Sequence, residues 1–261
     1  MSSREGRKAA TREARIAAEA RVRAERARRR RLRALAGIVL TAAAVVAVAV
    51  AISSGGSANA ASGGRLVGAA FSSNLFAGIP QHGTVLGRSN APVKMVEFAD
   101  LQCPYCDAYS VQTLPTLVNE YVRPGKLQLQ FENLSFIGPG SVAAGRVAAA
   151  AARQDKLWNF VDLLYLNQGR ENTGYVTPAY LRRLLRAIPQ LNVAAAISGS
   201  QTPSADAALS QANEVASQDG INATPSFLIG KTGGPLHQFQ PTSLDPAPFQ
   251  AAISRSLGTA P

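Results

Sequence analysis

The apolar positions of the chain begin with one uninterrupted run, residues 34–52, which reads ALAGIVLTAAAVVAVAVAI and contains no charged side chain. A helix of this length, at about 1.5 Å per residue, crosses the roughly 30 Å hydrocarbon core of a bilayer. An arginine-rich segment, RARRRRLR at 26–33, precedes the run, and small polar residues follow it at 53–64. Because Lys and Arg favour the cytoplasmic side, the pattern predicts a transmembrane helix with its N-terminus in the cytoplasm and the rest of the chain outside.

Two other interpretations of this segment stay open. Ala58-Asn59-Ala60 fits a signal-peptide cleavage site, although the charged region before the apolar run is long for a signal. A buried helix of a globular protein is the other interpretation, which the neighbouring arginines disfavour. An anchor and a cleaved signal both place the remaining chain outside the cytoplasm. The expected organisation is a basic cytoplasmic tail (1–33), a transmembrane helix (34–52), a linker (53–77) and one folded domain (78–261).

Beyond the linker, the hydrophobic pattern indicates strands and helices in alternation. VKMVEFA at 93–99 is a short, β-favouring apolar run typical of a buried strand, and LQLQFENL at 127–134 is a second. Between them, residues 103–121 have the pattern of a helix that ends before the turn at Pro124-Gly125. Strand, helix and strand in this order predict a parallel βαβ unit.

A long helical stretch follows, from residue 141 to residue 218. Its expected helices are 141–153, 155–168, 177–188 and 204–218. Two short runs, 226–230 and 236–240, predict a β-hairpin, and residues 245–257 predict a closing helix. The sequence thus predicts an α/β domain with a helical insertion.

Charge is distributed unevenly along the chain. The protein has 27 Lys and Arg against 16 Asp and Glu, a net charge of +11, and residues 1–33 hold 13 of the basic and 4 of the acidic residues. From Ser53 onward the net charge is only +2. We therefore expect no nucleic-acid partner, because the basicity belongs to the tail and not to the domain. The tail is expected to lie against an anionic membrane surface.

The only two cysteines of the chain, Cys103 and Cys106, stand three residues apart in DLQCPYC. A zinc site needs four ligands, and the two histidines, His82 and His237, lack ligand spacing, so no metal is expected. A structural disulfide gains little from closing a two-residue loop. Two unrelated core cysteines are not expected so close together outside the cytoplasm.

A redox dithiol is the favoured interpretation of this pair. Cys103 stands near the start of a predicted helix, and Pro104 occupies a position where helices tolerate proline. Unpaired N–H groups and the positive end of the helix dipole favour a thiolate at Cys103. Cys106, one turn later, is close enough to attack a mixed disulfide formed by Cys103.

On these residues, the chain resembles the DsbA-like thioredoxin-fold family of membrane-tethered or secreted oxidoreductases. The resemblance runs from about Gly78 to Leu257 and rests on GIPQ, VEFADLQCPYC, the helical insertion and GINATPSFLIG. Cys-x-x-Cys after a strand, combined with a distant Thr-Pro-x-Phe, is a specific pairing. The resemblance implies a thioredoxin fold with a helical insertion at about 141–218.

The resemblance also implies roles for further residues. Thr224 and Pro225 match the position of a cis-proline that faces the dithiol and pairs with extended substrate; an ordinary trans-proline at a strand start is the alternative. Glu97 matches the family's buried acid, which exchanges protons with the second cysteine; a solvent-facing strand glutamate is the alternative. Pro104 and Tyr105 are expected at the surface that contacts substrate.

The implied function is the oxidation of paired cysteines in exported proteins by a Cys103–Cys106 disulfide, without a bound cofactor. The resemblance further implies reoxidation by a membrane quinone-linked protein, and we expect a monomer. Tyr105 stands where the strongest oxidants of the family carry histidine, so the direction of the reaction stays open. A reductase or isomerase is one alternative, and a non-catalytic thioredoxin-fold binding module with structural cysteines is another.

Overall fold

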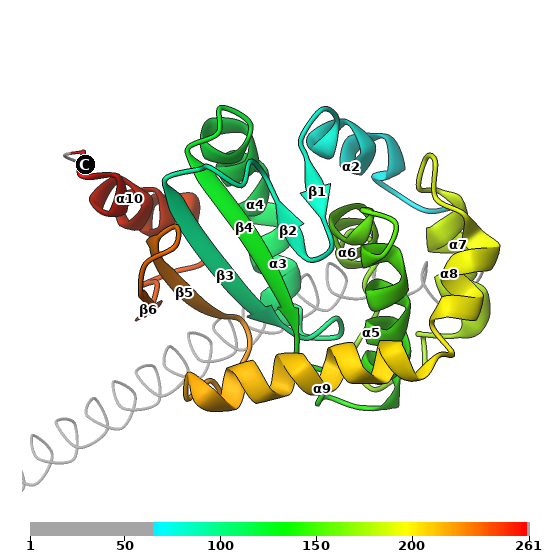
Figure 1. Ribbon diagram of the computed structural model, residues 1–261. Coiled ribbons are helices and arrows are strands. Elements are labelled where there is room, and N and C mark those ends of the chain that lie inside the picture. The colour runs from blue at the N-terminus through cyan, green and yellow to red at the C-terminus, as the bar shows by residue number, and fades with distance from the viewer. Residues whose placement is uncertain (1–64, 260–261) are drawn as a thin grey trace, which may run out of the picture. The chain divides into compact units, whose positions relative to one another are not determined.

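The computed structural model describes residues 65–259 as a mixed β-sheet covered by helices (Figure 1). The predicted tail, the predicted transmembrane helix and the first part of the predicted linker lie outside these residues. No helix within 65–259 is both long and apolar enough to cross a membrane.

In this part of the chain the sheet has six strands in the order β1-β2-β4-β3-β5-β6. The strands are β1 (Gln81–His82), β2 (Val85–Leu86), β3 (Val93–Ala99), β4 (Leu127–Asn133), β5 (Ser226–Lys231) and β6 (Leu236–Phe239). Strands β3 and β4 are parallel, and the other neighbouring strands are antiparallel. The predicted βαβ unit is therefore present, and β3 is a central strand paired along both edges.

The helices fall into three groups along the chain. The crossover from β3 to β4 contains α3 (Pro104–Gln112), α4 (Leu114–Leu117) and the π-helical turn η1 (Val118–Val122). The helical insertion between β4 and β5 contains α5 (Pro139–Ala152), α6 (Leu157–Tyr165), α7 (Pro178–Arg186), α8 (Val193–Gly199) and α9 (Pro203–Gln218). Helix α2 (Ala69–Phe76) precedes the sheet, and α10 (Pro246–Leu257) follows it. The predicted α/β fold with a helical insertion is confirmed.

Side chains along β3 alternate between two cores, because successive residues of a strand point to opposite faces. Met95 lies in the larger core, to which α3, α4 and α10 contribute. Val96 and Phe98 face the other way, into a smaller core with alanines of α9. Glu97 shares the side of Met95, so the alternation turns its carboxylate toward α3.

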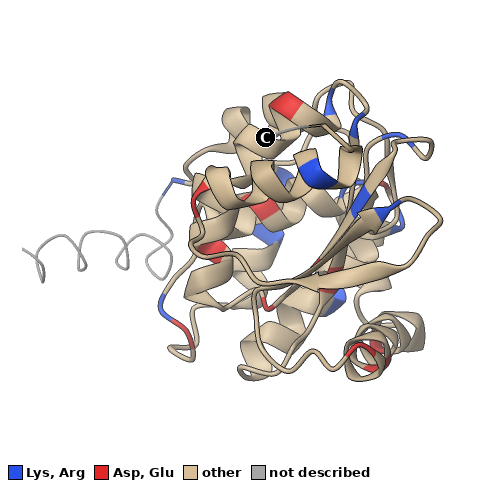
Figure 2. Ribbon diagram, turned by 90° about the vertical axis from the view of Figure 1, so that its left-hand side faces the viewer, with Lys and Arg blue, Asp and Glu red and all other residues tan. Residues whose placement is uncertain are grey.

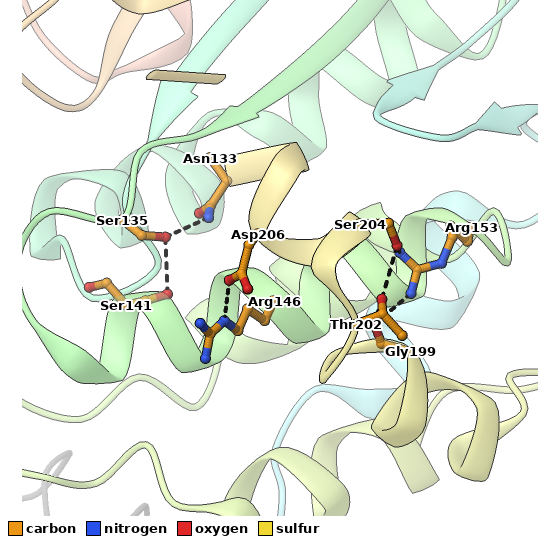
Figure 3. A network of polar contacts seen from close by, with 9 residues as sticks. All are labelled: Asn133, Ser135, Ser141, Arg146, Arg153, Gly199, Thr202, Ser204 and Asp206. Atoms are coloured by element: carbon orange, nitrogen blue, oxygen red, sulfur yellow. Dashed lines mark hydrogen bonds and ion pairs between the residues drawn. The ribbon is translucent and has the colours of Figure 1, made fainter. Parts of the chain in front are cut away.

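Polar contacts join α5 to α9 and to α8 (Figure 3). Arg146 Nε of α5 donates to Asp206 Oδ1 of α9 at 2.6 Å. Arg153, at the end of α5, donates to the carbonyl of Gly199 at 2.8 Å. These contacts are exposed to solvent, and exposed ion pairs contribute at most about 1 kcal/mol each. Apolar packing must therefore supply most of the attachment of α9.

The segment before the sheet departs from the expected organisation. The sequence predicts a linker up to residue 77, but residues 69–76 form α2, which packs on α6 and buries Leu75 and Phe76. The prediction of a linker over these residues is wrong. The physical reason is that a short, weakly patterned apolar segment becomes helical when a partner surface buries its side chains.

Two other segments differ in detail from the sequence prediction. Residues 78–87 are rich in turn formers, yet they contain β1 and β2, and β2 extends the sheet by pairing with β4. The helix predicted over 103–121 is interrupted at Thr113, just before Pro115. Proline lacks the N–H of a continuous helix and clashes with the preceding turn.

Charged residues of both signs are scattered over the described fold. Figure 2 shows this from the side of α10, where isolated acidic and basic positions are spread over helices, strands and loops. This distribution agrees with the small net charge of the chain from Ser53 onward.

Gly145 of α5 marks a close approach that a side chain would disturb. A Cβ atom at this position would lie 2.7 Å from Leu209 Cδ2 and 2.2 Å from Asn133 Nδ2. We expect Gly145→Val to destabilise the fold by about 1–3 kcal/mol, because overpacking forces neighbouring side chains from their positions. Urea unfolding measures this loss. The adjacent exposed variant Arg146→Ala should change stability by less than about 1 kcal/mol. Equal losses in both variants would contradict the close packing.

Candidate active site

The dithiol segment leaves the end of β3 and begins helix α3. Strand β3 ends at Ala99, and the N–H of Cys103 donates to the carbonyl of Asp100 at 3.0 Å, which forms a tight turn between strand and helix. Cys103 is the N-cap of α3, and Pro104 is its first residue, where a missing N–H removes no helical bond. Cys106 follows one turn later and is fully buried, and both cysteines are free thiols.

The Cys103 thiol has a lowered pKa. A hydrogen bond from the Cys106 thiol contributes most, and burial opposes it. A hydrogen bond from the Thr224 side chain and the backbone N–H groups of Cys106 and Tyr105 lower the pKa further, to about 6. These N–H groups belong to the first turn of α3, where they have no partner within the helix and where the helix dipole is positive. Cys103 is therefore mainly a thiolate at pH 7, which is the reactive form.

Behind Cys103, Cys106 and Glu97 share a buried region. Burial raises the pKa of Cys106 well above its ordinary value, and the hydrogen bond to Cys103 and the charges of Cys103 and Glu97 raise it further. Glu97 is only 4% exposed, and burial first and Cys103 second raise its pKa to about 8. Its Oε1 atom has no hydrogen-bond partner within the described residues. Glu97 therefore holds a proton at neutral pH.

Thr224 and Pro225 face the first cysteine. They precede β5, whose pairing with β3 brings this part of the chain beside the dithiol loop. The Thr224–Pro225 peptide bond is cis, and the Cys103 thiol donates to the Thr224 carbonyl at an Sγ–O distance of 3.5 Å. Tyr105 is 67% exposed at the start of α3. The residues that the sequence predicts for the site are thus gathered around the first turn of this helix.

Three further residues, which the sequence did not predict, hold the dithiol loop. The Asp100 carboxylate is fully buried and accepts four hydrogen bonds. The hydroxyl of Tyr165 donates to the Asp100 carbonyl at 3.1 Å, and Gln168 Nε2 donates to the carbonyl of Cys103 at 3.2 Å. The local sequence marks Asp100, because it is an acidic residue between two apolar ones. Nothing in the local sequence marks Tyr165 or Gln168.

Within residues 65–259, no group of three or more His, Cys, Asp or Glu side chains is placed to hold a metal ion.

Comparison with known proteins identifies the family. A family model described as thioredoxin matches residues 81–245. This span is more than half of the chain and contains the dithiol, the helical insertion and the Thr224–Pro225 bond. The chain therefore belongs to this thioredoxin family, and its fold is similar to that of a solved DsbA structure.

One sequence relative and two solved structures are similar to this chain. The "Probable disulfide bond formation protein D" of Bacillus cereus is 39% identical over 111 residues, which are 41% of this chain and 51% of that protein. The chain thus spans about half the length of this curated relative. The crystal structure of oxidised BdbD from Bacillus subtilis has a TM-score of 0.59 at 21% identity and covers 69% of this chain and 97% of that chain. The alpha-DsbA1 structure from Wolbachia pipientis has a TM-score of 0.56 at 18% identity, with 67% and 90% covered.

In the reduced protein, we expect iodoacetamide to modify Cys103 selectively, with a half-maximal rate near pH 6. Cys106→Ala should move this midpoint upward, because it removes the hydrogen bond that most stabilises the thiolate. Cys106→Ser keeps a donor, and its midpoint should stay lower than that of the alanine variant. Mass spectrometry after timed alkylation across a pH series measures both. Equal midpoints for the two variants would contradict this explanation of the Cys103 pKa.

The raised pKa of Glu97 makes folding stability depend on pH. Its ordinary value is 4.5, and the folded protein raises it to about 8, so the folded protein retains a proton that the unfolded chain releases between these values. Stability contributed by the protonated group is therefore complete below about pH 4.5 and is lost as the pH rises toward 8. Glu97→Gln removes this dependence. The free energy of unfolding of the variant, relative to that of the wild type, should rise by roughly 2–4 kcal/mol from pH 5 to pH 8.

Urea unfolding of the reduced protein at both pH values measures this gain. The exposed variant Glu214→Gln serves as the control and should show no such pH-dependent gain. A Glu97→Gln difference that is the same at pH 5 and pH 8 would show that the carboxylate titrates normally.

Proposed function

We propose that this protein is an extracytoplasmic thiol:disulfide oxidoreductase that introduces disulfide bonds into exported proteins through Cys103 and Cys106. The observation that carries the proposal is the Cys103 thiol at the start of α3, with a pKa near 6, beside the Thr224 carbonyl. The name of the Bacillus cereus relative, a probable disulfide bond formation protein, agrees with this activity.

The exchange begins with the Cys103–Cys106 disulfide. A substrate thiolate attacks the Cys103 sulfur, forms a mixed disulfide and releases Cys106 as a thiolate. The pKa of Cys106 is high, so this thiolate takes up a proton, and the protonated Glu97 is the neighbouring donor. A second substrate thiolate then attacks the substrate sulfur of the mixed disulfide, and Cys103 leaves as a stable thiolate. The substrate gains a disulfide, and its two electrons remain in the protein as the dithiol.

Substrate binding is assigned to the surface around Cys103. The backbone at Thr224, before Pro225, lies beside the Cys103 sulfur, where an extended substrate segment can pair with it. Pro104 and the exposed Tyr105 supply contacts at the start of α3. The direct partners are exported proteins with paired cysteines.

The proposal includes the organisation expected from the sequence. A basic tail (1–33) lies against the anionic inner surface of the membrane, and residues 34–52 either anchor the protein or act as a signal cleaved near Ala60. The catalytic domain lies outside and works as a monomer. A membrane quinone-linked protein reoxidises the dithiol by accepting its two electrons.

A reductase or isomerase is the second candidate, because the same exchange runs in reverse when the dithiol is the better electron donor. The observation that favours it is the side chain between the cysteines. Tyr105 is neutral and largely exposed, so it adds no positive charge that would stabilise the Cys103 thiolate. A less stable thiolate makes the couple more reducing.

The reduction potential of the full-length protein in detergent, equilibrated with glutathione, distinguishes the two directions. We expect roughly −120 to −180 mV, because a stable Cys103 thiolate favours the reduced form. A value near about −270 mV would make the protein an electron donor instead. Cys103→Ser should abolish exchange, and Cys106→Ser should accumulate a mixed disulfide with glutathione. No exchange by the wild type would refute the enzyme and leave a binding module.

A further inference from the structure

Asp100, the first residue after β3, carries a fully buried carboxylate with hydrogen bonds at both oxygens. Oδ1 accepts from the N–H of Gln102 at 2.8 Å and from the hydroxyl of Ser141 at 2.5 Å. Oδ2 accepts from the N–H groups of Phe136 and Ile137 at 2.9 and 3.0 Å. The donors come from the dithiol loop, from the segment after β4 and from the first turn of α5. Such bonds offset the cost of burying a charge.

Ser141 extends this arrangement to the end of β4 (Figure 3). Its carbonyl accepts from the Ser135 hydroxyl at 3.1 Å, and Asn133 Nδ2 donates to the Ser135 oxygen at 2.7 Å. Asn133 is the last residue of β4 and pairs in register with Ala99, the last residue of β3. The carboxylate therefore connects the ends of the two parallel strands to the N-terminus of α5.

The helical insertion also reaches the dithiol loop from α6 and the residues after it. The buried hydroxyl of Tyr165 donates to the Asp100 carbonyl, which also accepts from the N–H of Cys103. Gln168 Nε2 donates to the carbonyls of Leu101 and Cys103 at 3.3 and 3.2 Å. The insertion thus holds the loop at several backbone groups, and Asp100 is the residue at which the side-chain and backbone contacts meet.

We propose that Asp100 is a positioning residue, whose carboxylate fastens the dithiol loop to the helical insertion and so places the Cys103 sulfur against the first turn of α3. The inference rests on the proposed function and deepens it, because it gives the insertion a part in setting the reactivity of the dithiol. Asp100 acts through Cys103, and no contact with substrate is assigned to it.

The hydrogen-bond pattern requires a side chain that only accepts. A carboxylate accepts at both oxygens, whereas the amide of asparagine, which has nearly the same size, has one oxygen and one donating NH₂ group. In one orientation the NH₂ group faces the N–H groups of Phe136 and Ile137, and in the other it faces Gln102 and Ser141. Asp100→Asn therefore leaves buried donors without acceptors and loosens the loop without opening a cavity.

Asp100→Asn has two effects of opposite sign on the Cys103 thiolate. Loss of a nearby negative charge by itself lowers the pKa of Cys103. Loss of alignment with the N–H groups of α3 removes hydrogen bonds to the thiolate and raises the pKa. The positioning role predicts that the second effect dominates. The direction of the shift therefore separates a residue that holds the loop from one that acts only by its charge.

The test measures the pH dependence of Cys103 alkylation and the glutathione equilibrium of the full-length protein. We expect Asp100→Asn to raise the Cys103 pKa by about one unit, and thereby to slow alkylation at pH 6 roughly two- to fivefold. The glutathione equilibrium should shift roughly fivefold toward the oxidised protein, because the reduced form loses thiolate stabilisation.

Asp162→Asn is the matched control. Asp162 is also a buried aspartate, but it lies in α6 near Ser72, and its Oδ2 atom has no partner within the described residues. The control variant should leave both the alkylation midpoint and the glutathione equilibrium at their wild-type values. A shift of equal size in the control would mean that general loosening of the fold, and not the Asp100 contacts, controls the thiol, which overturns the inference.

An unchanged or lowered Cys103 pKa in Asp100→Asn also overturns the inference. Absence of glutathione exchange in the wild type refutes the proposed function instead, and the alkylation profile then still tests the placement of Cys103. If Asp100→Asn does not fold, Ser141→Ala and Tyr165→Phe each remove one hydrogen bond to Asp100. Both should raise the Cys103 pKa by a smaller amount, and wild-type midpoints in both would count against the positioning role.

Discussion

Strand β3 is hydrogen-bonded to β4 along one edge and to β5 along the other, and both of its faces are buried. The backbone that leaves it at Ala99 therefore has a fixed origin and direction. The loop from this end delivers Cys103 to the start of α3, and the alternation of the strand turns Glu97 beneath the dithiol. Pairing with β5 brings Thr224 to the Cys103 sulfur. The site is assembled around the end of one central strand.

Burial affects the two thiols differently because their hydrogen-bond partners differ. Cys103 receives hydrogen bonds from Cys106 and from the first turn of α3, so its pKa is lowered despite partial burial. Cys106 lies deeper and faces the charges of Cys103 and Glu97, so its pKa is raised. The same burial keeps Glu97 protonated at neutral pH. The lowered pKa of Cys103 suits it as the leaving group. The protonated Glu97 supplies a proton where the Cys106 thiolate forms.

Elements with strong local patterns are predictable from this sequence, and weakly patterned ones are not. The apolar run of β3, the Cys-Pro start of α3 and the long α9 each have a clear local signal, and the structure contains all three. Helix α2 falls in a segment without clear periodicity, and it is helical because α6 covers its apolar residues. Strands β1 and β2 have two residues each and exist through pairing with β4. Their stability comes from partners that no local window contains.

The sequence by itself determined that a thiol stands at the start of a helix after a buried strand, because cysteine spacing, Pro104 and the strand pattern act between neighbours in the chain. Only the tertiary structure decided that Glu97 is buried instead of solvent-facing, that Thr224 meets Cys103 and that the Asp100 carboxylate collects four donors. These features depend on sheet register and on the docking of the helical insertion, which bring together groups that are far apart in the sequence.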